Sequence, residues 1–124
     1  MYWYLLLRND QCTFGSLVLI EKNFFKKYSD LSEESHREKF CIIKEIESKG
    51  KDFLKFDKIN YLMLMMVDLE VHVHVIPRYS TDKYYKKTIF SDPGWPGLPQ
   101  LNFNNNMQRN VYQSLVLELR TIFS

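Results

Sequence analysis

The sequence has 124 residues and a formal net charge of only +2, with 45% hydrophobic and 26% charged residues. This length and composition predict one compact domain, residues 1–124, with a real hydrophobic core. The charge gives no electrostatic reason to bind nucleic acid, and no apolar run approaches the ~20 residues of a membrane span. The start of the chain lacks the basic segment of a secretion signal, and Cys12 and Cys41 form no Cys-x-x-Cys pair. We therefore expect a cytoplasmic protein without disulfides.

Two short runs rich in aromatic and branched residues, 2–8 and 16–22, lie near the start of the chain. The segment between them is polar and contains Gly15, which is typical of a turn. The pattern therefore predicts a pair of antiparallel strands.

A helix is predicted next. Asp30 and Glu33 have the spacing of a capping box, and Gly50 suits a helix end. Three residues at helical spacing predict its apolar stripe: Phe40, Ile43 and Ile46.

Residues 58–67 and 70–78 favour a second antiparallel pair, because both runs are rich in residues that strands prefer. Only Asp68 and Leu69 separate them, which predicts a two-residue hairpin. Residues 79–105 look irregular, since three of the four prolines fall in this segment.

The last segment, 111–123, is predicted to be helical behind an Asn-rich cap at 104–106. Four apolar residues support it by their spacing: Val111, Leu115, Leu119 and Ile122. The whole order predicts an α+β fold, an antiparallel sheet of about five strands with a main helix and a C-terminal helix on one face.

The segment LEVHVHVIPRYS, residues 69–80, is the most informative in the chain. Strand alternation places Glu70, His72 and His74 on one face, and Val71, Val73 and Val75 on the other. Such a face could be a hydrogen-bonded or merely exposed polar stripe, or a metal site with Glu70 as third ligand. It also suits nucleophilic chemistry, because one neutral imidazole can attack phosphorus while the other stabilises the phosphate.

These residues resemble the histidine triad (HIT) family of nucleotide hydrolases and transferases. The family pattern is His-x-His-x-His followed by two apolar residues, often ending HVIPR, and HVIPR is residues 74–78 here. Residues 9–34, 58–68 and 92–99 extend the resemblance over nearly the whole chain, apart from a shortened N-terminus. His72 matches the central histidine and His74 the third, whereas Glu70 takes the place of the first.

The resemblance implies a HIT-like domain, a covalent nucleotidyl-histidine on His72, and His74 as the residue that binds phosphate or assists the leaving group. It implies that the backbone carbonyl of residue 70 orients the ring of His72. The ribose is expected near Asn9 and Asp10. The base is expected among apolar side chains such as Leu6 and Val18, which could equally belong to the core.

The resemblance further implies a nucleotide as the partner and a homodimer, with no membrane or nucleic acid involved. No cofactor is firmly implied, although a divalent metal could accompany a polyphosphate substrate. Arg78 is a candidate for phosphate binding, with a carboxylate-paired role as the alternative.

Two departures from the family pattern weaken the expectation of efficient turnover. Glu70 would raise the pKa of His72 and repel phosphate, unless its carboxylate turns aside to a cation or hydroxyl. Met65 and Met66 stand where other members carry phosphate-binding polar residues, and methionines there favour core or interface packing. The alternative function is a non-catalytic nucleotide-binding or regulatory protein.

Overall fold

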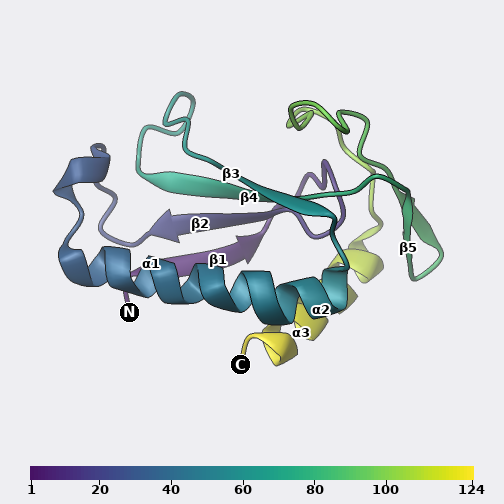
Figure 1. The fold of residues 1–124 in the computed structure, drawn as a ribbon, viewed down its shortest axis with the longest axis horizontal. Coiled ribbons are helices and arrows are strands. Elements are labelled where there is room, and N and C mark those ends of the chain that lie inside the picture. The colour runs from purple at the N-terminus through teal and green to yellow at the C-terminus, as the bar shows by residue number, and fades with distance from the viewer.

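A computed structural model describes residues 1–124 (Figure 1). The main sheet contains β1 (Trp3–Leu7), β2 (Leu17–Glu21), β3 (Lys58–Leu62) and β4 (His72–Arg78), arranged in the order β1-β2-β4-β3. A separate hairpin contains β5 (Lys83–Tyr85) and β6 (Thr88–Phe90). The helical elements are a short 3₁₀ turn (Tyr28–Asp30), α1 (Glu33–Glu45), a π-helical turn (Ile46–Gly50), α2 (Lys51–Leu54) and α3 (Arg109–Ile122). The predicted α+β class is confirmed.

One face of the sheet is covered by the helices, as Figure 1 shows for α1, α2 and α3. The alternate valines of the β4 segment, Val71, Val73 and Val75, are at most 4% exposed and face this layer. They pack in one cluster of 15 buried residues with, among others, Ile46, Leu54, Leu115 and Leu119 from the helical layer. Burying the odd-numbered residues of β4 turns its even-numbered residues, including both histidines, toward the opposite face.

The first predicted strand pair is confirmed, with Trp3 opposite Glu21 and Leu7 opposite Leu17. Gly15 has a positive φ of 78° in the intervening turn, and a Cβ there would lie 2.6 Å from a methyl carbon of Leu54. Glycine is therefore required both by the backbone and by the close packing of this turn against α2.

The second pair is antiparallel, but the predicted two-residue hairpin is wrong. β3 ends at Leu62 and β4 begins at His72, with Leu62 opposite His74. The connection is therefore the nine-residue segment 63–71, which includes Met65 in a left-handed conformation at φ 44°. The apolar run at 63–67 resembles a strand in sequence, yet these residues leave the sheet.

The helix predicted from Asp30 to Gly50 exists, with different ends. Its first turn is capped by Ser32, whose side chain accepts a hydrogen bond from the Ser35 backbone N–H. Helical structure continues through the π-turn and ends only after Leu54, where Lys55 adopts a left-handed conformation at φ 58°. The predicted stripe is wrong at Phe40, which is 59% exposed, while Ile46 is fully buried.

The C-terminal helix is confirmed, and its residues Val111, Leu115 and Leu119 are buried as predicted. The predicted Asn-rich cap is wrong, because Gln108 is the N-cap residue and no side chain caps the helix. The segment 79–105 is not wholly irregular, since it contains the β5–β6 hairpin. No helix of the chain combines the length and apolarity that crossing a membrane would need.

Candidate active site

The face of the sheet opposite the helices carries a pocket of about 660 Å³. Its floor comes from side chains of three neighbouring strands, and Leu6, Val18 and His74 lie in one row across them. The walls come from the turn after β1 and the connection before β4. The full lining is Leu6, Leu7, Arg8, Asn9, Asp10, Val18, Ile20, Phe24, Asp68, Glu70, His72 and His74. A volume between ~300 and ~1,000 Å³ is usual for small-molecule sites.

His72 is held by the backbone of its own strand. Its Nδ1 lies 2.7 Å from the carbonyl oxygen of Glu70. A carbonyl can only accept a hydrogen bond, so Nδ1 carries the ring proton and Nε2 keeps its lone pair. The side chain is only 8% exposed, and its strand position fixes the ring at the floor of the pocket. In its neutral form the ring therefore presents an oriented nitrogen with a free lone pair.

His74 lies beside His72, with 5.0 Å between the ring centroids and 85° between the ring planes. Its Nδ1 is buried without a hydrogen-bond partner. Burial, helped by the positive charge of Arg8 and by His72, lowers the pKa of His74, and Asp68 opposes this by attraction. A neutral ring at pH 7 keeps one proton, and only Nε2 can donate that proton to a ligand.

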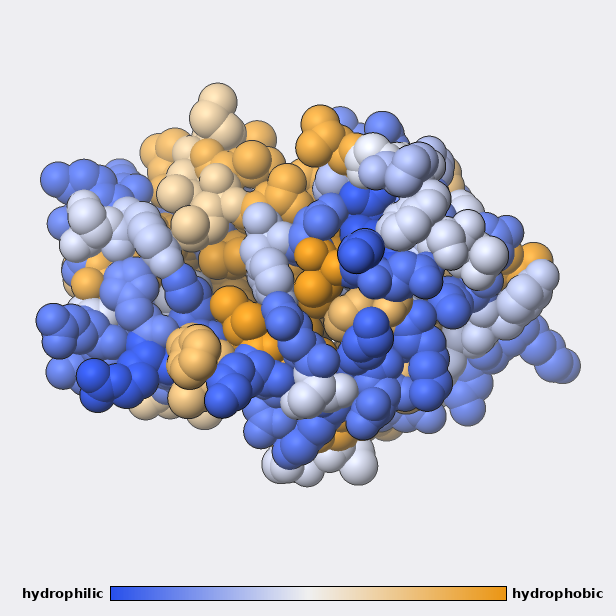
Figure 2. Space-filling model, viewed as in Figure 1, coloured by the Kyte–Doolittle hydropathy of each residue, from blue (hydrophilic) through white to orange (hydrophobic).

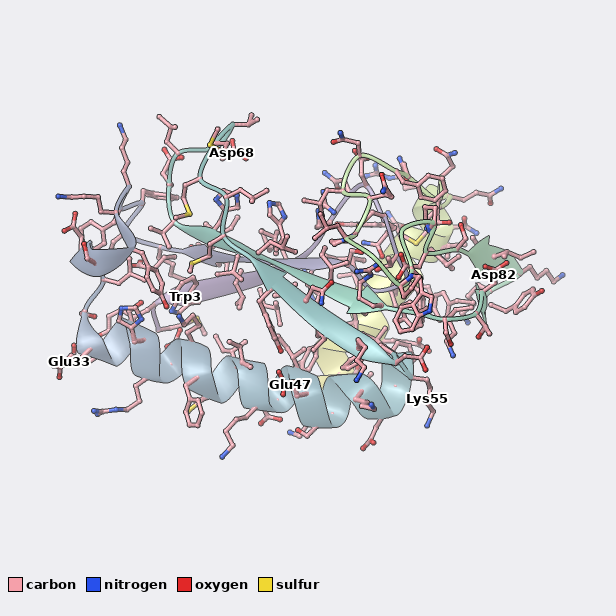
Figure 3. The ribbon with its side chains drawn as sticks, turned by 45° about the horizontal axis from the view of Figure 1, so that its top comes forward. Trp3, Glu33, Glu47, Lys55, Asp68 and Asp82 are labelled. Atoms are coloured by element: carbon pink, nitrogen blue, oxygen red, sulfur yellow. The ribbon has the colours of Figure 1, made fainter.

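The connection of residues 63–71 stands above the sheet on the pocket side. Figure 3 shows Asp68 on this connection, far from Glu33 and Glu47 of the helical layer. Asp68 and Glu70 both line the pocket from this side. Neither carboxylate makes a hydrogen bond or an ion pair within the chain, so both remain available to a ligand.

Solved structures with a similar fold include several histidine triad proteins. One from Sinorhizobium meliloti shares 20% identity at a TM-score of 0.76, covering 97% of this chain and 82% of the other. A hypothetical histidine triad nucleotide-binding protein from Sulfolobus tokodaii shares 20% sequence identity at a TM-score of 0.70. The match covers 98% of this chain and 78% of the other. The chain has the histidine triad fold. No protein-family model matches the sequence, and no curated protein does.

On this histidine triad fold, most of the residues predicted from sequence come together. All seven of the following line the one pocket: Leu6, Asn9, Asp10, Val18, Glu70, His72 and His74. Leu6 and Val18 thus belong to the pocket rather than to the core. The predicted contact between His72 and the backbone carbonyl of residue 70 is present.

Arg78 lies outside the pocket and is 3% exposed. Its guanidinium donates to both carboxylate oxygens of Asp92, at 2.8 and 3.1 Å, and to the side chain of Asn60 and the carbonyl of Gly97. Asp92 also accepts from the Tyr79 N–H. The assignment of Arg78 to nucleotide binding is therefore corrected: it is paired with a carboxylate and anchors the 91–107 segment to β4.

Sequence reasoning missed five pocket residues: Leu7, Arg8, Ile20, Phe24 and Asp68. Strand alternation could have found Ile20, because it shares a face with Val18 and stands opposite His72. Arg8 directly precedes the predicted Asn9. Asp68 was assigned to a tight hairpin turn, and only the longer connection brings it over the pocket.

No group of three or more His, Cys, Asp or Glu side chains is arranged to hold a metal ion. The structure therefore does not bring Glu70 and the two imidazoles into one ligand set. A histidine triad family protein from Mycobacterium smegmatis is zinc-bound, at 18% identity and a TM-score of 0.55, covering 94% of this chain and 82% of the other.

The connection above the pocket also exposes apolar side chains. Figure 2 shows an orange lobe over this connection at the upper left. Met66 and Val67 are 77% and 96% exposed. Met66 therefore does not pack in the core, and interface packing, the other expectation for this residue, stays a prediction.

Proposed function

We propose that this chain is a nucleotidyl hydrolase or transferase acting on the α-phosphate of a nucleoside phosphate, a dinucleoside polyphosphate or a phosphoramidate through His72. The contact between His72 Nδ1 and the Glu70 carbonyl carries the proposal. It fixes the tautomer in which Nε2 is nucleophilic, and it does so on a floor shared with His74.

In the first step, the Nε2 lone pair of His72 attacks the α-phosphorus, and the bond from phosphorus to the leaving group breaks. The leaving group takes a proton, and the nucleotidyl group stays on His72. In the second step, water attacks phosphorus, the bond to His72 breaks, and a nucleoside monophosphate is released. His74 is suited to donate from Nε2 to a phosphate oxygen, because burial keeps its ring neutral.

The pocket has room and suitable chemistry for the nucleoside. Leu6 and Val18 offer an apolar surface to a base, and Asn9 and Asp10 offer hydrogen bonds to a ribose. The Sulfolobus tokodaii neighbour is described as nucleotide-binding, which supports the same ligand class for this fold. We extend the proposal to a two-fold homodimer, which sedimentation at twice the monomer mass would support and a purely monomeric species would contradict.

The test is release of adenosine monophosphate from adenosine 5′-phosphoramidate and from a dinucleoside polyphosphate. His72→Ala is expected to reduce kcat/KM by about a thousandfold or more, because the nucleophile is lost. His36→Ala is the matched control, since His36 lies on α1 and packs against Tyr28 outside the pocket. Equal release by the wild type and His72→Ala would remove His72 from the nucleophile role.

A non-catalytic nucleotide-binding protein is the second candidate, favoured by the apolar character of 63–67 and by Glu70. This candidate predicts saturable nucleotide binding without monophosphate release. Glu70→His distinguishes an impaired triad, in which activity rises, from a glutamate with its own role, in which activity falls.

A further inference from the structure

The pocket is lined by one cation, Arg8, and by three carboxylates, Asp10, Asp68 and Glu70. Arg8 follows β1, and its backbone N–H donates to the Ser16 carbonyl, at the end of the sheet away from His72. Its guanidinium donates to Cys12 Sγ at 3.2 Å and to the Leu101 carbonyl at 3.5 Å. This cation is therefore held in place at one end of the pocket.

Glu70 lies on the side of His72 away from Arg8, and Asp68 lines the same pocket from the connection before β4. Ile20 stands opposite His72 in the sheet, and Glu70 precedes His72 by two residues, one step further from Arg8. Rows on one face of a sheet are about 7 Å apart, so Arg8 and Glu70 are several rows apart along the pocket. Glu70 is thus one step along the chain direction from the nucleophile and remote from Arg8.

Independent features identify this region as a ligand site. His72 is 8% exposed and oriented by a backbone carbonyl, and the buried Nδ1 of His74 has no partner in the protein. Both rings line the same pocket as the two unpaired carboxylates. With the nucleoside at the Asn9 and Asp10 end, as proposed above, a leaving group on the far side of phosphorus would lie toward Glu70 and Asp68.

We propose that Glu70 and Asp68 determine specificity, selecting a leaving group that carries a positive charge over a neutral or polyphosphate one. The proposal rests on the nucleotidyl transfer proposed above, and it names a phosphoramidate of a diamine-like compound as the substrate class. His72 attacks phosphorus, the phosphorus–nitrogen bond breaks, and the departing nitrogen takes a proton from solvent to leave as an amine. Water then attacks phosphorus, the bond to His72 breaks, and a proton returns to solvent. The distant ammonium of the leaving amine is paired with the carboxylates, whereas a polyphosphate meets like charges there.

The experiment compares two adenosine 5′-phosphoramidates of equal length, whose leaving amines end in an ammonium or in a methyl group. The wild type is expected to show about tenfold higher kcat/KM for the ammonium compound, with the ratio falling at high salt. The double variant Glu70→Gln/Asp68→Asn is expected to bring the ratio close to one. Asp52→Asn, an exposed carboxylate on α2, is expected to keep the wild-type ratio.

A wild-type ratio near one, or a ratio unchanged in the double variant, would overturn the selectivity proposal while leaving nucleotidyl transfer intact. Absence of turnover for both compounds would instead contradict the proposed function. In that case the two compounds are measured as ligands of His72→Ala by calorimetry. Tighter binding of the ammonium compound, lost when Glu70→Gln and Asp68→Asn are added, supports charge selection, and equal affinities refute it.

Discussion

At the scale of single residues, the two histidines differ in how their ring nitrogens are satisfied. The Nδ1–H of His72 donates a hydrogen bond to the Glu70 carbonyl, whereas the buried Nδ1 of His74 has no hydrogen-bond partner. In the neutral ring, the first arrangement leaves an acceptor for a ligand, and the second leaves only Nε2 of His74 for a ligand to meet. Because a backbone carbonyl orients His72, the side chain at position 70 is free to vary without disturbing the tautomer.

The pKa of His74 provides a direct test of the charges around it. Burial lowers this pKa first, Arg8 and His72 lower it further, and Asp68 raises it. Asp68→Asn is therefore expected to lower the pKa of His74, and Arg8→Gln to raise it. Both shifts can be followed by NMR titration of the imidazole protons. A pKa that rises in Asp68→Asn would show that Asp68 does not face His74.

At the scale of elements, the sequence predicted those that repeat a simple pattern. The valines of β4, the leucines of α3 and the strand pair β1–β2 alternate or recur at helical spacing, and all are present. The connection 63–71 could not be predicted this way, because its apolar residues satisfy the strand pattern although the chain leaves the sheet at Leu62. Its path depends on contacts that sequence periodicity does not describe, such as the Val71 N–H to Phe25 carbonyl bond of 2.7 Å.

The same limit explains the outcome for the site. His72, His74 and Glu70 follow from alternation along one strand, so their shared face could be predicted. Arg78 has the same alternation, but the carboxylate of Asp92, 14 residues further on, removes it from the pocket. Long-range pairing of this kind leaves no periodic signal in the sequence.

The Arg78–Asp92 pair is expected to be important for stability. Both side chains are almost fully buried, at 4% and 0% exposed, and the Arg78 Nε lies 2.8 Å from Asp92 Oδ2. Asp92→Ala would leave a buried guanidinium without its carboxylate, at a cost of about 3–5 kcal/mol in the free energy of unfolding. Denaturant titration measures this. Asp82→Ala, at an exposed site (Figure 3), is the control and is expected to change stability by less than about 0.5 kcal/mol.

At the scale of the whole molecule, buried titratable groups predict how stability depends on pH. The pKa of His74 is lower in the folded protein than its usual value near 6.5, so the unfolded chain binds the proton more tightly. The contribution of His74 to the free energy of unfolding is complete above about pH 6.5, and it is lost as the pH falls through the lowered pKa of His74. The exposed carboxyl of Asp57, whose pKa is lowered by hydrogen bonds from Ser80, acts in the same direction at more acidic pH.

The pKa of Tyr79 is shifted in the opposite direction, and this shift affects stability at alkaline pH. Burial raises the pKa of Tyr79 well above its usual value near 10, and its hydroxyl donates to the Phe14 carbonyl at 2.8 Å. A raised pKa stabilises the fold below about pH 10, and the contribution is lost as the pH rises through the folded value.

Thermal unfolding is therefore expected to give the highest Tm between about pH 7 and pH 9, with a decline on both sides. Tyr79→Phe should lower the Tm at neutral pH, because the hydrogen bond to the Phe14 carbonyl is lost. It should also weaken the decline in Tm at alkaline pH, because position 79 no longer carries a buried phenol that can ionise. Tyr84→Phe is the matched control, since Tyr84 is 74% exposed and has no buried hydroxyl to lose. An alkaline decline of the same slope in Tyr79→Phe and the wild type would mean that another group causes it.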